Sequence, residues 1–140
     1  MAKTAILRPG SVVDGTPPSG STAGAYALGD QVVWTAVPTL QNSWANVASF
    51  QAAEYRRDFQ GVVHLRGTLD TGTKAATTLI TTLPAGSRPA AAVIVNVVSD
   101  VAAGVATTLR IATTGAITVG TVALTAACQI TLNGISFDTA

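Results

Sequence analysis

Residues able to perform chemistry are scarce in this sequence, and His64 is its single histidine. Catalysis by a serine requires a base, and His64 is the one candidate for that role. No Gly-x-Ser-x-Gly sequence accompanies it. His64 instead stands beside Arg66 in an alternating apolar and polar stretch, which is typical of a strand. We therefore expect a surface or interface residue, not a catalytic base.

The acidic residues show no arrangement that suits catalysis. They are Asp14, Asp30, Glu54, Asp58, Asp70, Asp100 and Asp138. Most stand in expected turns, where aspartate bonds to its own backbone, so a carboxylate pair for glycan cleavage is not indicated. One histidine and one cysteine cannot supply a metal-ligand cluster. We predict no catalytic, cofactor or metal site, and a protein that is not an enzyme.

Two other features have structural explanations. Gly67 and Gly72 are spaced as in a phosphate-binding loop, but that motif needs lysine directly after the second glycine, and Thr73 stands there instead. Cys128 is the single cysteine, so no disulfide can form within the chain. Its apolar surroundings predict a buried, unreactive thiol.

Charged residues make up 11% of the chain, beside about 25% in ordinary soluble domains. Two explanations are open: Thr, Ser, Gln and Asn solvate the surface, or other copies of the chain cover part of it. The mean hydropathy of +0.43 favours the second. The few basic residues are scattered and the net charge is +1, so we expect no binding to nucleic acid.

Membrane insertion and secretion are not indicated either. The most apolar stretch, residues 90–105, is interrupted by Asn96, Ser99 and Asp100 and falls short of the ~18 apolar residues of a membrane-spanning helix. The N-terminus shows no long apolar leader. We expect a product made and assembled in a cytoplasm.

Short runs of strand-forming residues alternate with turn signals from Val32 onward. The clearest is residues 61–69, where apolar residues at odd positions alternate with His64, Arg66 and Thr68. Asn133-Gly134 and Thr114-Gly115 predict hairpin turns. Further strands are predicted at residues 32–37, 76–83, 91–98, 105–113, 116–119, 128–132 and 135–137, while residues 46–54 stay unassigned. The pattern predicts an all-β fold, an antiparallel β-sandwich of jelly-roll-like type.

Residues 1–31 differ from the rest, because they are rich in glycine, proline and small polar residues. Two interpretations are open: a disordered tail, or an extended arm that becomes ordered on a neighbouring subunit. We divide the chain into an N-terminal arm for attachment, residues 1–31, and a head domain, residues 32–140. Within the head, we expect Trp34 and Trp44 to bury most of their rings at its base instead of forming a platform for sugars.

An ordered series of motifs resembles a head domain common in bacteriophage tail fibres and minor tail proteins. The matching segments are residues 40–44 (LQNSW), 55–67 (YRRDFQGVVHLRG), 83–89 (LPAGSRP) and 130–137 (ITLNGISF). The family usually has glycine where Ser43 stands and an aromatic residue where Ser87 stands. The resemblance implies a β-sandwich that trimerises around a threefold axis and displays variable loops for host recognition. It implies no shared set of binding residues.

These observations predict a homotrimeric structural protein of a phage tail, located in the virion. The arm would bind other phage structural proteins, and the head would contact a host-surface glycan or protein. His64, Arg66 and Thr68 form a polar face that could line the trimer axis. The alternative is a capsid decoration (cement) protein with the same trimeric head.

Candidate binding residues lie in three turns, at residues 70–74, 99–104 and 113–115. We expect these turns at one end of the head, because antiparallel sandwiches place their loops at the ends. The structural alternative is that they merely join strands. The candidates are Asp70, Thr71, Gly72, Lys74, Asp100 and Thr114.

Overall fold

The structure of the protein is a computed structural model that describes residues 33–70, 72–98, 106–124 and 129–140. The predicted arm, Thr71, Asp100 and Cys128 lie outside the described residues. The strands are β1 (Thr35–Ala36), β2 (Ala45–Asn46), β3 (Glu54–Arg57), β4 (Val62–Arg66), β5 (Thr68–Asp70), β6 (Leu79–Thr82), β7 (Val93–Val98), β8 (Ala106–Ile111), β9 (Ala116–Val119), β10 (Gln129–Thr131) and β11 (Ser136–Asp138). A short 3-10 helix, η2, spans Ala85–Ser87.

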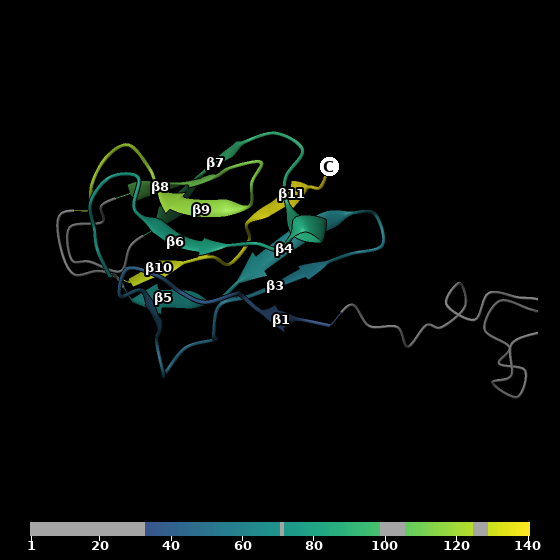
Figure 1. Ribbon diagram of the computed structural model, residues 1–140. Coiled ribbons are helices and arrows are strands. Elements are labelled where there is room, and N and C mark those ends of the chain that lie inside the picture. Colours follow the sequence, from purple (N-terminus) through teal and green to yellow (C-terminus); the bar gives the residue numbers. More distant parts are fainter. Residues whose placement is uncertain (1–32, 71, 99–105, 125–128) are drawn as a thin grey trace, which may run out of the picture. The chain divides into compact units, whose positions relative to one another are not determined.

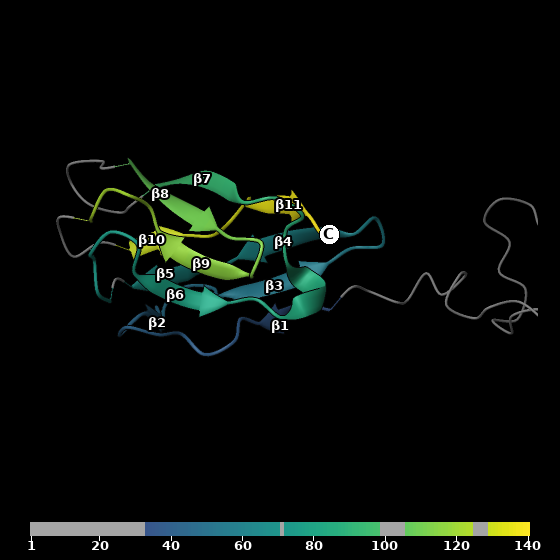
Figure 2. The ribbon, with the colours of Figure 1, turned by 45° about the horizontal axis from the view of Figure 1, so that its top comes forward.

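The strands pack as two layers (Figures 1 and 2). The first layer holds two sheets, ordered β1-β3-β4-β11 and β10-β5-β2, and the second layer is the sheet β6-β9-β8-β7. Every strand pair is antiparallel. The prediction of an all-β antiparallel sandwich is confirmed. Among the described residues, no helix has the length and apolar character needed to cross a membrane.

Alternation along β4 and β5 builds the inner face of the first layer. Val63, Leu65 and Leu69 are buried, whereas His64 and Arg66 are half-buried on the outer face. Residues from both layers meet in one core, because each strand directs every second side chain inward. The largest fully buried side chains include Leu69, Ile80, Leu83, Leu109, Ile111, Ile117, Ile130 and Leu132.

Gly67 is the single residue between β4 and β5, which otherwise continue one another along the chain. Its φ of 114° lies in the left-handed region, and a Cβ there would collide with the carbonyl group of Ala52. The Gly67 N–H donates to the side-chain Oδ1 of Asn133 at 2.8 Å. The break separates the two sheets of the first layer but preserves the alternation that buries Leu65 and Leu69.

Turns gather at two ends of the sandwich. The hairpin end carries the β3–β4 turn (residues 58–61) and the β8–β9 turn (residues 112–115) (Figures 1 and 2). Thr139 belongs to the same end, because it is bonded to Gly61. The Thr139 N–H donates to the Gly61 carbonyl at 3.1 Å, and the Leu83 N–H donates to the Gly115 carbonyl at 2.9 Å. The first bond joins the C-terminal segment to the β3–β4 turn of the first layer, and the second joins the chain after β6 to the β8–β9 turn of the second layer.

The far end carries the last residue of β5 and the junction where Val98 pairs with Ala106. Lys74 belongs to this end, since its carbonyl accepts the N–H of Leu124 at 2.9 Å. Six residues of β8 separate the two ends, which corresponds to about 20 Å of extended chain.

Candidate functional site

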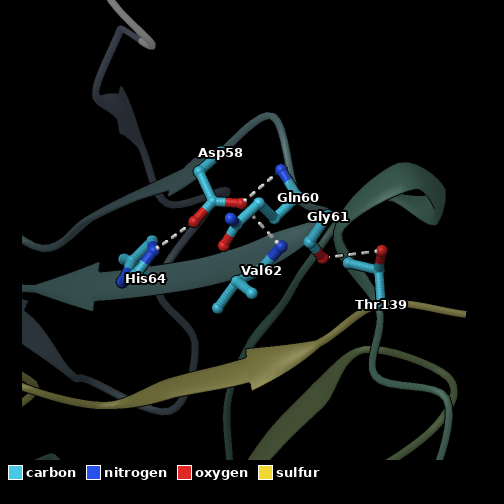
Figure 3. A network of polar contacts seen from close by, with 6 residues as sticks. All are labelled: Asp58, Gln60, Gly61, Val62, His64 and Thr139. Carbon is cyan, nitrogen blue, oxygen red and sulfur yellow. Dashed lines mark hydrogen bonds and ion pairs between the residues drawn. The ribbon is translucent and has the colours of Figure 1, made fainter.

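A polar network closes the β3–β4 hairpin (Figure 3). Asp58 Oδ1 accepts the backbone N–H groups of Gln60 and Val62, each at 2.9 Å. Asp58 Oδ2 lies 2.9 Å from His64 Nε2. The Gly61 N–H also donates to the Asp58 carbonyl at 3.1 Å. Both oxygens of the carboxylate are therefore engaged inside the hairpin.

The C-terminal segment holds the same hairpin from its other side. The Thr139 hydroxyl donates to the Gly61 carbonyl at 2.9 Å, beside the backbone bond between the same two residues (Figure 3). Gly61 has a φ of 85°, which glycine adopts without steric cost and which suits the last position of a three-residue hairpin loop. The turn is thus fixed from both sides, and Phe59 at its tip is 81% exposed.

The environment of Asp58 favours its charged form. The hydrogen bond with His64 is the main cause that lowers the pKa of Asp58 below its ordinary value of 3.8, and the Val62 N–H acts in the same direction. The contact is an ion pair only when the imidazole is protonated. Asp58 is therefore a charged structural acceptor at neutral pH.

Serine, histidine and aspartate do come together on this face, because Ser136 of β11 pairs with His64 of β4. A nucleophilic serine must share a hydrogen bond with the imidazole. The described contacts include none between Ser136 and His64, and the imidazole Nε2 is occupied by Asp58. Within the described ranges, no three His, Cys, Asp or Glu side chains are grouped to hold a metal ion. The arrangement suits a structural role for the His64–Asp58 pair.

Trp34 lies beneath two guanidinium groups on the outer face of the first layer. The Arg66 Cζ is 4.1 Å from the centre of the Trp34 ring, and the Arg56 Cζ is 4.7 Å from it. Such cation–π contacts contribute about 0.5 to 2 kcal/mol each. Trp44, by contrast, is 3% exposed in the core. The expectation of buried tryptophan is confirmed for Trp44, whereas arginines and not the core cover Trp34.

Glu54 completes this outer cluster. It faces Arg66 across β3 and β4, and Arg66 Nε donates to Glu54 Oε2 at 2.7 Å. Gln51 Nε2 donates to the same oxygen at 3.2 Å. The cluster was not predicted from the sequence. Alternation in β3 would have placed Glu54 and Arg56 on one face, but pairing β3 with β4 in register was needed to bring them to Arg66.

The sequence-predicted binding residues divide between the two ends. Asp70 ends β5 at the far end, and Gly72 and Lys74 follow it there, where the Thr73 N–H donates to the Asn42 carbonyl at 2.8 Å. Thr114 lies in the β8–β9 turn at the hairpin end. Thr71 and Asp100 lie outside the described residues. The expectation that all three turns share one end is wrong for Thr114, because β8 begins at one end and finishes at the other.

Sequence comparison identifies no relative: no family model and no curated protein matches this chain. Structural comparison finds the receptor binding protein (gp15) of Listeria phage PSA, with a TM-score of 0.66. The two proteins share a fold. The match covers 79% of this chain and 66% of that chain, at 19% sequence identity. At that identity, the likeness concerns the arrangement of strands and not the side chains of a site.

Proposed function

We propose that this protein is a structural protein of a bacteriophage tail whose head domain contacts the host surface, and that it is not an enzyme. The observation that carries the proposal is the fold shared with the gp15 receptor binding protein over 79% of this chain. The ordered tail-protein motifs support it independently, because they come from the sequence alone. The polar networks on the first layer also favour a scaffold, since their charged groups bind one another.

One departure from the family motifs has a structural explanation that strengthens the resemblance. Asn42 and Ser43 have φ angles of 54° and 65°, in the left-handed region that favours glycine. The family pattern has glycine at the position of Ser43. The turn that places Trp44 in the core therefore has the conformation that the family's usual residue would accept.

We further propose that the head functions as a homotrimer. His64 and Arg66 contact Asp58 and Glu54 of their own chain, so the polar face is already paired within one subunit. The edge strand β7 is a better contact surface, because Ile94 and Val98 are 69% and 70% exposed on it. Burial of these side chains between copies agrees with the low charge fraction of the chain.

Cryo-electron microscopy of the particle that carries the protein tests position and copy number together. We expect threefold density at the tail and inhibition of adsorption by an excess of the purified protein. Density at threefold points of the capsid would support the decoration protein instead. Adsorption that proceeds unchanged at saturating protein would contradict a role in host contact.

A further inference from the structure

The tip of the β3–β4 hairpin presents a large apolar side chain to solvent. Phe59 is 81% exposed, the highest exposed fraction given for any large apolar residue in the described ranges. We propose that Phe59 is the anchor by which the head docks into an apolar pocket of a different virion protein, at the end where the head joins the particle. This inference rests on the proposed function, because it requires that the protein be part of a virion.

The hairpin is held in the form that a docking anchor requires. Asp58, which directly precedes Phe59, accepts the backbone N–H groups of Gln60 and Val62 beyond it, and the Thr139 hydroxyl donates to the Gly61 carbonyl (Figure 3). Aromatic anchors that are fixed before binding lose little conformational freedom when they enter a pocket. The hairpin is therefore ordered without any partner, while the ring that it carries is left exposed.

The path of the chain indicates which partner lies at this end. Thr35 pairs with Tyr55 and Ala36 with Glu54 in an antiparallel register, so Val33 and Trp34, which precede β1, lie toward the turn at residues 58–61. Val33, the first described residue, lies at this end of the domain and is 75% exposed. If residues 1–31 attach the head to the particle, the hairpin end faces the particle and the far end faces away.

The chemistry of the tip favours a protein pocket over a glycan. Binding a sugar requires polar groups placed around an aromatic face. The carboxylate oxygens of Asp58 are already bonded to the hairpin and to His64. The tip exposes the Phe59 ring with Arg57 and Gln60 beside it, and Val33 is exposed at the same end of the domain. An aromatic anchor with a polar rim is the composition of a protein–protein interface.

The test uses full-length chains in particles assembled with a variant in place of the wild-type protein. We expect Phe59→Ala to reduce the copies retained per purified particle at least about tenfold, as for an interface hot spot. Phe50→Ala is the matched control, because Phe50 is 54% exposed and precedes β3, away from the hairpin tip. It should change retention less than about twofold, which is within the range of energetically neutral contact residues.

Three readouts distinguish the outcomes. Thermal melting of purified Phe59→Ala and Phe59→Gln should match the wild type, and binding of both variants to host cells should be unchanged. Normal retention of both variants in particles would overturn the inference about Phe59 and leave the proposed function standing. Lost cell binding with normal retention would place Phe59 at the host contact and also overturn it. Absence of the wild-type protein from particles would instead overturn the proposed function.

Discussion

At the scale of single residues, Asp58 carries the largest share of the hairpin's polar contacts. Its carboxylate accepts two backbone N–H groups and contacts His64. Hydrogen bonding to an ionised acceptor is roughly twice as strong as between neutral groups. The charged form of Asp58 should therefore stabilise the folded state more than a neutral side chain of the same shape.

This predicts a pH-dependent effect of Asp58→Asn. The folded pKa of Asp58 lies below its ordinary value of 3.8, mainly because of the His64 hydrogen bond. The added stability is then fully present above about pH 5 and is lost as the pH falls through the folded pKa. We expect the melting temperature of the wild type to exceed that of the variant at neutral pH and the two to converge below pH 4. Parallel melting curves from pH 2 to 7 would contradict this role.

Ser43 predicts an effect of opposite sign. A non-glycine residue in the left-handed region destabilises the folded state by roughly 1 to 2 kcal/mol. Glycine removes this strain, but it also increases the conformational entropy of the unfolded chain, which offsets part of the stabilisation. Ser43→Gly should raise the free energy of unfolding by roughly 0.5 to 1 kcal/mol in a urea titration. Ser136→Gly is the control, because Ser136 lies in β11 and loses strand stability with glycine. A destabilised Ser43→Gly variant would show that the 65° φ is not strained.

At the scale of elements, the edge strand β7 of the second layer is the surface that we propose to lie between copies of the chain. An exposed edge strand with apolar side chains is an aggregation hazard unless another surface covers it. We expect the double variant Ile94→Glu/Val98→Glu to convert the wild-type oligomer to monomer in light scattering at micromolar concentration. Val122→Glu, at an equally exposed position that lies outside the strands, should leave the oligomer intact. A monomeric wild type would contradict the trimer itself.

Strand positions were largely predictable, because alternation and turn residues are local properties. β9 begins and ends where predicted, and the Asn133-Gly134 turn separates β10 from β11 as expected. Residues 46–54 could not be assigned, since β3 begins only at Glu54 and its outward residues are defined by pairing with β4. The Asp58–His64 contact was missed for a similar reason. Each residue was interpreted separately, although a hairpin turn places both on one face.

At the scale of the whole molecule, the described core is built from residues of the head domain. Every buried apolar side chain of the described core lies between Trp44 and Phe137. We therefore expect deletion of residues 1–31 to leave the melting temperature of the head within a few degrees of the full chain. The same deletion should abolish incorporation into particles. An unfolded truncated protein, or one incorporated at normal occupancy, would contradict the assignment of an attachment arm.

The two ends of the sandwich give the molecule a polarity that the sequence did not reveal. The β8–β9 turn lies with the β3–β4 hairpin (Figure 1). Asp70, the last residue of β5, and Lys74, whose carbonyl accepts the Leu124 N–H, belong to the far end. If the hairpin end faces the particle, the far end is the one that contacts the host. Thr114 is then no longer a candidate binding residue, because it lies at the hairpin end. The path of the chain decides at which end each turn lies, because each antiparallel strand carries the chain from one end of the sandwich to the other.

The junction between the two sheets of the first layer has a consequence for chemical ageing. Asn133 is thermolabile by residue type, and Gly134 leaves its backbone unhindered, since no atom of the described residues lies within 4 Å of a Cβ placed there. Loss of the side-chain amide through a succinimide would alter the group that accepts the Gly67 N–H at 2.8 Å. Prolonged storage at alkaline pH should therefore produce a deamidated form with a lower melting temperature. Peptide mass spectrometry would locate the change at Asn133, and an unmodified peptide after such storage would show that the sheet junction protects it.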